Sequence, residues 1–393
     1  MSPPMSPGAI SRRYALFYAT LFTAIGALLP FWPLWLEARG LTPAQIGLLL
    51  ALGSWIKLVA NPGLAHLSDR AGWSKGTIVL LTAVSLVLYT AFIPAQGFVW
   101  ILVLQLLAAA TFPLLVPLVE SQTLAASYRH ALDYGRIRLW GSLAFIAGSL
   151  VTGRLIAADD AEWVLWVTLL AIGPALLAAA ALPGRAVTGA PHDPAEDVSL
   201  RRVLRLFTQR GTATLLVASA LIQASHAAYY GFSSLAWKAA GIGETTIAIL
   251  WTEGVVAEIL FFAFSRRLAD RLSPATLMIG AGLLGVLRWT VTGLTSEIAA
   301  LAAVQLLHAA TFAATHLAAM HYITRTTPPR LAASVQSLYS ALSGGLVMGG
   351  TMLLAGSLYA SGPGLPFLAM AGLSLAAAVL AFAAGLLGRA KPA

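Results

Sequence analysis

The 393-residue chain contains no cysteine, and charged residues make up only 10% of it. Without thiols the protein can form no disulfide and can use no thiolate chemistry. It also lacks HExxH, GxSxG and P-loop motifs, and no aspartate cluster could hold a metal–phosphate group. These absences argue against an enzyme, and we expect no cofactor. The scarcity of charge argues against a soluble protein, in which about a quarter of the residues would be charged.

Apolar residues are abundant instead. Hydrophobic residues make up 59% of the chain, and the mean hydropathy is +0.81. They occur in runs of about 20 residues, the length of helix that crosses ~30 Å of hydrocarbon. Because no water is present there to satisfy the backbone, we expect each run to be a helix. The predicted fold class is therefore an all-α integral membrane protein.

Twelve spans follow from these runs, six on each side of a polar linker at residues 184–210. We predict one six-helix bundle over residues 1–183 and a second over residues 211–393. The first run is longer than the 7–15 residues of a signal-peptide core, so we interpret it as an uncleaved helix. The predicted spans are Tyr14–Leu36, Gln45–His66, Thr77–Ile93, Phe98–Leu124, Leu139–Ile156, Trp163–Leu182, Thr212–Trp237, Thr246–Phe264, Ala275–Leu294, Ile298–Ile323, Leu331–Leu358 and Leu365–Leu387.

The distribution of basic residues predicts the orientation. Of the 24 lysines and arginines, only Arg39, Arg154 and Lys238 fall in outer loops if the N-terminus is cytoplasmic. Lys57 and Arg288 lie inside spans, and the others fall in segments on the N-terminal side of the membrane. Positive charge concentrates on the cytoplasmic side of membrane proteins, facing anionic lipid. Both termini are thus predicted to be cytoplasmic in a bacterial inner membrane, and the net charge of +9 needs no nucleic-acid partner.

The two halves repeat each other. LSDR at residues 67–70 recurs as LADR at residues 268–271, and QLLAAATF at residues 105–112 recurs as QLLHAATF at residues 305–312, at nearly the same offset. Transporters are commonly built from such repeats, with the site between the repeats near the midplane of the bilayer.

Several ionisable side chains fall inside spans or at their ends. A charge at the centre of a membrane helix costs at least ~2.5 kcal/mol unless it is paired or hydrated, so it marks a solute or proton path by default. Glu120 and Arg138 would neutralise each other and offer polar groups to a ligand, or they form a buried ion pair that only joins two spans. Arg138 suits a carboxylate because its planar fork contacts both oxygens. Lys57 is a second candidate unless it reaches the headgroups.

Two glutamates of the eighth span are candidates for proton transfer. Glu253 and Glu258 are five residues apart, or about 140° on a helix, so they cannot face the same point. We expect one to face the cavity and the other to pair with a basic group such as Arg288. A carboxyl group among apolar atoms can exchange a proton near neutral pH, as proton-driven symport requires.

Histidines of the second half could suggest a metal. His308, His316 and His321 are poorly placed around one helix to chelate, so no metal site is expected. His226, Tyr229 and Tyr230 share a stretch of the seventh span. Such a polar aromatic stripe suits a flat aromatic ligand, although hydrogen bonds between helices would explain it equally well.

The loop AHLSDRAGWSK resembles the signature loop of the major facilitator superfamily, with Asp69, Arg70 and Gly72 in the expected places. LADR is similar to the weaker second copy, which contributes Asp270 and Arg271. The resemblance implies twelve helices in two bundles and cytoplasmic charge pairs that stabilise the outward-open state.

A closer resemblance extends over most of the chain. LPFWPLWLEARGLTPAQIGLLL, DYGRIRLWGSLAF and SHAAYYGFSSLAW look like the phenylpropionate permease branch, a relative of lactose permease. This implies an aromatic carboxylate imported with a proton. Glu120 and Arg138 match the substrate-binding pair of lactose permease. Glu253, Arg288 and His308 fall where that protein keeps its proton-coupling groups.

Three positions depart from lactose permease. Thr311 replaces the expected acidic residue, and Gln305 replaces the expected basic one. Phe145 replaces the tryptophan expected to stack on a sugar ring. The first departure shifts the proton to Glu253 or Glu258, and the third weakens a sugar substrate.

The sequence thus predicts a monomeric major facilitator symporter whose two bundles rock about a central site for a small molecule. Alternatives in the same fold are a sugar or nucleoside permease and a drug or metabolite exporter. From another class comes a non-transporting membrane sensor or assembly factor, which need not keep the charges inside its spans.

Overall fold

The computed structural model describes residues 5–71, 74–184 and 200–389, and within these ranges its regular structure is entirely helical. The chain divides into two compact units. The first comprises Met1–Thr42, Ile56–Asp193 and Gly243–Ala248, and the second comprises Pro43–Trp55, Pro194–Ile242 and Ile249–Ala393. The predicted bundle boundaries at residues 183 and 211 remain a prediction.

The helices of the first unit follow one another along the chain, and the second half of α2 (Pro43–Ala71) belongs to them. Pro113 lies in the short 3₁₀ turn η1, where a proline interrupts the α-helical hydrogen bonds of the predicted fourth span. The elements are α1 (Pro7–Ala38), α3 (Ser74–Ala91), α4 (Phe98–Thr111), η1 (Phe112–Leu114), α5 (Leu115–His130), α6 (Tyr134–Ala158) and α7 (Trp163–Ala181).

The second unit holds the first half of α2 and most of α12. It also contains two π-helical turns: η2 lies between α14 and α15, and η3 lies between α16 and α17. The elements are α9 (Leu200–Phe207), α10 (Arg210–Ala224), α11 (Ala227–Ala239), α12 (Glu244–Arg271), α13 (Pro274–Leu294), α14 (Ile298–Gln305), η2 (Ala309–Ala314), α15 (Thr315–Thr326), α16 (Pro329–Ser340), η3 (Ala341–Val347), α17 (Met348–Tyr359) and α18 (Leu365–Arg389).

Ten helical stretches of the described chain are long and apolar enough to cross a bilayer. Two predicted spans are not among them, for separate reasons. The third is a shorter apolar helix, Lys75–Ala91. The seventh is divided into α10 and α11 at Ser225 and His226. Ten long stretches, a shorter helix and a divided one are consistent with the twelve predicted spans.

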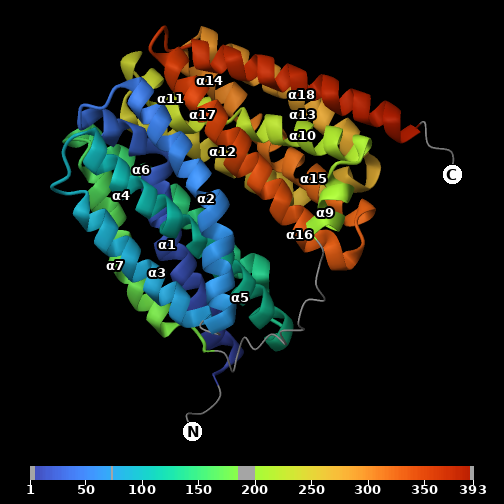
Figure 1. The fold of residues 1–393 in the computed structure, drawn as a ribbon. Helices are drawn as coiled ribbons and strands as arrows, with labels where there is room; N and C mark the ends of the chain where they lie inside the picture. The colour runs from blue at the N-terminus through green and yellow to red at the C-terminus, as the bar shows by residue number, and fades with distance from the viewer. Residues whose placement is uncertain (1–4, 72–73, 185–199, 390–393) are drawn as a thin grey trace. The chain divides into compact units, whose positions relative to one another are not determined.

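Glycines let α1 and α6 approach closely in the first unit (Figure 1). A Cβ atom on Gly148 would lie 2.5 Å from the carbonyl oxygen of Thr23, and one on Gly26 would collide with the backbone of Phe145. Small residues at a helix interface allow the van der Waals contact that drives helix association in lipid. The interface of α1 and α6 therefore depends on these two positions.

Helices α13 and α18 lie side by side in the second unit (Figure 1). A Cβ atom on Gly282 would lie 2.9 Å from Cβ of Ala378, and one on Gly285 would lie 2.8 Å from Oγ of Ser374. Arg288 is one turn farther along α13, so the tight packing of these helices fixes its position.

Breaks in the α-helical pattern occur next to two histidines of the second unit. His226 precedes α11 as its N-cap, and His308 precedes the π-helical turn η2. Single π-helical turns are frequent at functional sites because they shift the direction of side chains. Both histidines therefore lie at interruptions of α-helical structure, and both contact Arg288.

Candidate functional site

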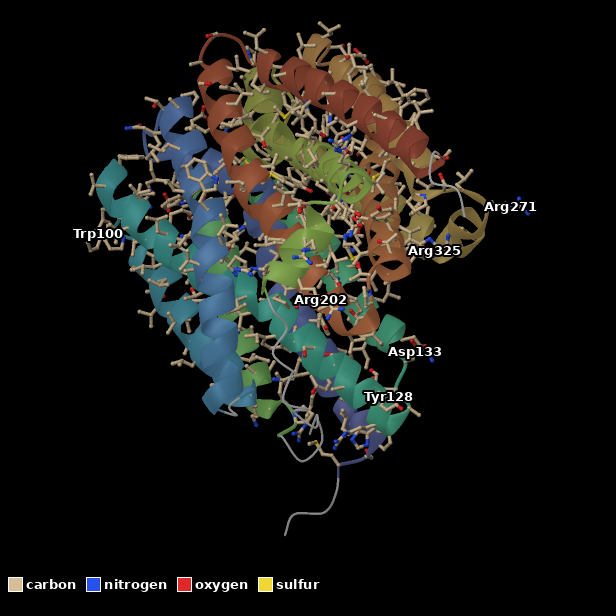
Figure 2. The ribbon with its side chains drawn as sticks, turned by 45° about the vertical axis from the view of Figure 1, so that its right-hand side comes forward. Trp100, Tyr128, Asp133, Arg202, Arg271 and Arg325 are labelled. Atoms are coloured by element: carbon tan, nitrogen blue, oxygen red, sulfur yellow. The ribbon has the colours of Figure 1, made fainter. Side chains whose placement is uncertain are left out.

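In the first unit the structure brings Glu120 and Arg138 together. Nε of Arg138 donates a hydrogen bond to Oε1 of Glu120 over 3.1 Å. A short turn joins α5 to α6: Ala131 adopts a left-handed φ of 49°, and Asp133 caps α6. Asp133 and the exposed Tyr128 mark this turn in Figure 2. The opposite charges of Arg138 and Glu120 balance each other. Because their side chains are 28% and 33% exposed, the pair is accessible to a ligand.

The guanidinium of Arg138 also lies against two rings of α1. Its carbon is 4.2 Å from the ring centroid of Phe22 and 5.6 Å from that of Tyr18. A Cβ atom on Gly141 would lie 2.9 Å from Nη1 of Arg138, so a larger residue here would shift the guanidinium. Cation–π contacts and one carboxylate therefore hold Arg138.

The two other binding residues predicted in this unit lie apart from that pair. Lys57 is half-buried on α2, and no hydrogen bond or ion pair of the described residues joins it to Glu120. Phe145 is buried two turns beyond Arg138 on α6, with its backbone packed against Gly26.

The second unit buries a cation, Arg288, whose side chain is 0% exposed. Its Nη1 donates to Oγ1 of Thr311 at 2.9 Å and lies 3.1 Å from Nδ1 of His308 and 3.2 Å from Nε2 of His226. Its Nη2 donates to Oε1 of Gln305 at 3.0 Å. In the described part of the chain, no carboxylate lies within ion-pair distance of this guanidinium.

The surrounding atoms determine which nitrogen of each imidazole carries hydrogen. Nδ1 of His226 lies 3.1 Å from the carbonyl oxygens of Ile222 and Gln223, which can only accept, so Nδ1 is the donor. Its Nε2 then accepts from Arg288. Nδ1 of His308 also accepts from Arg288, which places the hydrogen of the neutral ring on Nε2. Both imidazoles are therefore neutral in this arrangement, and no carboxylate of the described residues contacts the positive charge of Arg288.

Aromatic rings enclose the guanidinium. Its carbon lies 4.3 Å from the ring centroid of Trp289 and 5.0 Å from that of Tyr229. Tyr229 in turn stacks on Trp251, with ring centroids 4.1 Å apart. The π faces lower the energy of the buried charge but supply no counter-ion. The nearby rings are those of Tyr229, Tyr230, Trp251, Trp289 and Phe312.

The two glutamates of α12 differ in their surroundings. Oε2 of Glu258 lies 3.7 Å from Nε2 of His308, within ion-pair distance but too far for a hydrogen bond. Glu253 is partly exposed and forms no ion pair among the described residues. Among the described residues, neither glutamate lies within ion-pair distance of Arg288, and the basic group within that distance of Glu258 is His308. Which of the two glutamates serves the cavity stays a prediction. Neutral side chains occupy the donors of Arg288, and the ring of His308 lies between Arg288 and Glu258.

The predicted gate residues lie mostly outside what the structure describes. Gly72 is outside the described residues, as are the side chains of Asp69, Arg70 and Asp270. Arg271 ends α12 with an exposed side chain that points outward in Figure 2. The charge pairs of these loops remain a prediction.

Reasoning from the sequence noted Gln305 and Thr311 only as departures from a pattern, and it gave Trp251 and Trp289 no role. One signal for Gln305 was available, because it opens the repeated QLL motif. Its counterpart Gln105 in the first unit accepts a hydrogen bond from Nε1 of Trp32 at 3.0 Å.

Comparison with known proteins gives consistent matches over most of the chain. Residues 11–369 match the MFS_1 like family. The chain is 34% identical over 349 residues to the probable 3-phenylpropionic acid transporter of Escherichia coli, covering 89% of this chain and 91% of that protein. It is 28% identical to the maltose permease of Geobacillus stearothermophilus, covering 86% of each. The crystal structure of the nucleoside transporter NupG has the same fold, with a TM-score of 0.82 at 15% identity, covering 97% of this chain and 100% of that one.

Proposed function

Because the chain belongs to the major facilitator superfamily, we propose that it is a secondary transporter that imports a small aromatic carboxylate together with a proton. The superfamily consists of membrane transporters of small molecules, so the chain is an integral membrane transporter and not an enzyme. The substrate class, the proton and the direction are the proposal.

The observation that carries the proposal is the buried cation Arg288, which no carboxylate of the described residues contacts. An arginine at the centre of a membrane helix costs ~2.5–3.5 kcal/mol on insertion scales, and most buried arginines pair with a carboxylate. The partners of Arg288 are two imidazoles, a hydroxyl and a carboxamide. A substrate carboxylate would supply the missing charge and accept two parallel N–H bonds.

The rings around Arg288 favour an aromatic substrate. Aromatic pairs contribute ~0.5–1.5 kcal/mol beyond the area that they bury. Tyr229, Tyr230 and His226 form part of this enclosure. The relative from Escherichia coli is named for 3-phenylpropionic acid, which combines a ring with a carboxylate.

A proton would make the import of an anion favourable against an inside-negative potential. Glu258 and His308 are the natural acceptors, because the ring of His308 lies between the carboxyl of Glu258 and the guanidinium of Arg288. The anion and the proton would then bind on opposite sides of one imidazole. Glu253 is the alternative acceptor.

The first unit would contribute a second polar surface. Glu120 and Arg138 are accessible and could bind polar groups of the substrate, and Lys57 and Phe145 remain further candidates in this unit. We further propose a monomer in the bacterial inner membrane with both termini cytoplasmic, as the distribution of basic residues predicts.

Uptake of labelled 3-phenylpropionate into proteoliposomes under an imposed pH gradient tests this function. Because protonated aromatic acids diffuse through lipid, vesicles that contain the Arg288→Gln variant serve as the control for leakage. We expect saturable uptake that the wild type alone supports, that a protonophore abolishes, and that aromatic acids but not neutral amides inhibit.

Wild-type uptake that is indifferent to the gradient would remove the proton from the proposal. Saturable uptake of maltose or a nucleoside, with no uptake of 3-phenylpropionate, would favour the alternative permeases.

A further inference from the structure

The surroundings of Arg288 leave one edge of its guanidinium without a complete set of acceptors. The rings of Trp289 and Tyr229 lie against its π system. Nη1 carries two hydrogens and already has three acceptors within 3.2 Å, those of Thr311, His308 and His226. A ligand that approached Nη1 would have to compete with all three.

The opposite edge, formed by Nε and Nη2, is different. Nε is buried and has no hydrogen-bond partner among the described residues. Nη2 donates to the carboxamide of Gln305. These two N–H groups are parallel, and a carboxylate binds such an edge through both of its oxygens.

A second buried donor of the same cluster also lacks a partner. Nε1 of Trp251 makes no hydrogen bond to any described residue, and the ring of Trp251 is 3% exposed. Its ring stacks on Tyr229, which in turn lies against Arg288. Two unpaired buried N–H donors in one cluster around a cation indicate a shortage of acceptors.

We propose that the Nε–Nη2 edge of Arg288 binds the substrate carboxylate, and that Gln305 occupies this edge in the absence of substrate and selects for an anion. This inference rests on the proposed function and assigns the carboxylate to the second unit, whereas the sequence favoured Arg138. The amide oxygen of Gln305 accepts one N–H bond but carries no charge, so a carboxylate displaces it.

The amide nitrogen of Gln305 explains how its oxygen can leave Arg288 while the side chain stays in place. Its Nε2 donates to the hydroxyl of Tyr229 at 2.9 Å and to the carbonyl oxygen of Leu250 at 3.0 Å. The amide thus stays bound to α11 and α12 while its oxygen leaves Arg288. Binding of substrate is thereby transmitted to both helices through one side chain.

Two substitutions at position 305 separate a charge effect from a packing effect. Gln305→Glu places an internal carboxylate on the edge with little change of shape. Gln305→Ala removes the competing oxygen and leaves the edge open. Gln336→Glu, on the exposed face of α16, is the matched control for adding a negative charge to this unit.

Binding of 3-phenylpropionate and its neutral amide to purified protein is measured by calorimetry and by the ligand-induced rise in Tm. We expect Gln305→Glu to weaken binding of the acid by roughly 100-fold or more, because its carboxylate takes the place of the ligand's. Gln305→Ala should bind the acid within about tenfold of wild type, and Gln336→Glu should match wild type. The amide should bind weakly to all of them.

The outcomes distinguish the two levels of the proposal. If wild-type protein binds no 3-phenylpropionate, the proposed function fails and this inference falls with it. If wild type binds the acid and Gln305→Glu binds it equally well, the function stands and the edge of Arg288 is not the carboxylate site. An equal loss in Gln305→Glu and Gln305→Ala, with both proteins folded, would make Gln305 a structural residue and overturn its role in selection.

Discussion

Replacing Arg288 by glutamine separates two roles of a buried cation, stabilising the fold and binding a ligand. The change removes three N–H donors that make four close contacts, because the two hydrogens of Nη1 are shared among three acceptors, and a hydrogen bond from a charged donor is worth ~1.5 kcal/mol or more. It also removes the cost of burying an ion, which is several kcal/mol in real proteins. Because these terms are similar in size and opposite in sign, we expect the free energy of unfolding to change by no more than about 2 kcal/mol.

The effect on the ligand should be far larger. A carboxylate that loses its buried cationic partner loses ~2–5 kcal/mol, or roughly 30-fold to several thousand-fold in affinity. Tm in detergent and the affinity for 3-phenylpropionate, measured on the same preparation, report the two effects separately. Arg325→Gln serves as the control, because Arg325 is exposed near the end of α15 (Figure 2).

The opposite pattern would refute the reasoning. If Arg288→Gln lowers Tm by more than about 10 °C while its folded fraction binds 3-phenylpropionate as tightly as wild type, Arg288 is a structural cation. The neutral partners would then be its permanent shell rather than groups that a substrate displaces.

Three further predictions follow from the same contacts. Glu258→Gln should still exchange substrate across the vesicle membrane when the pH is equal on both sides, but it should lose accumulation driven by a pH gradient. Glu253→Gln should keep both activities. The reverse result would move the proton to Glu253. Arg138→Gln should weaken uptake of 3-phenylpropionate less than Arg288→Gln does, because Arg138 already carries a carboxylate partner, and a competition series with ring-substituted acids would measure it. Gly148→Leu should destabilise the first unit by ~1–3 kcal/mol through overpacking against α1, seen as a lower Tm with unchanged affinity per folded molecule; an unchanged Tm would mean that the helices separate easily.

Most of the helical organisation could be predicted, because the length of an apolar run and the thickness of a bilayer are directly comparable. The run Ile298–Ile323 was predicted as one span, and it does form one helical stretch. Its π-helical turn after His308 could not be predicted, because one extra residue in a turn leaves the hydropathy unchanged. The break at Ser225 and His226 was hidden for the same reason, since apolar residues continue on both sides of it.

The charged residues of the second unit could be found from the sequence, but their pairing could not. Charge inside a span is visible in a sequence, so Arg288 and Glu258 were both identified. Whether Arg288 and Glu258 touch depends on which side chains lie between them. In the structure the ring of His308 lies between the two. Gln305 and Thr311 were visible as neutral replacements, yet their importance appears only once both are seen on the same guanidinium.

The repeated QLL motif shows where the two units have diverged. Gln105 of the first unit accepts from the neutral indole of Trp32, whereas Gln305 of the second accepts from the cation Arg288. In the first unit Arg138 carries its own carboxylate partner, Glu120, so this cation needs no anion from outside. The second unit has placed a cation at the repeated glutamine, and among the described residues its nearby carboxylate, Glu258, lies against His308 rather than against the guanidinium. Arg288 can therefore accept an anion without giving up an ion pair of its own, and that is where we propose that the carboxylate of a substrate binds.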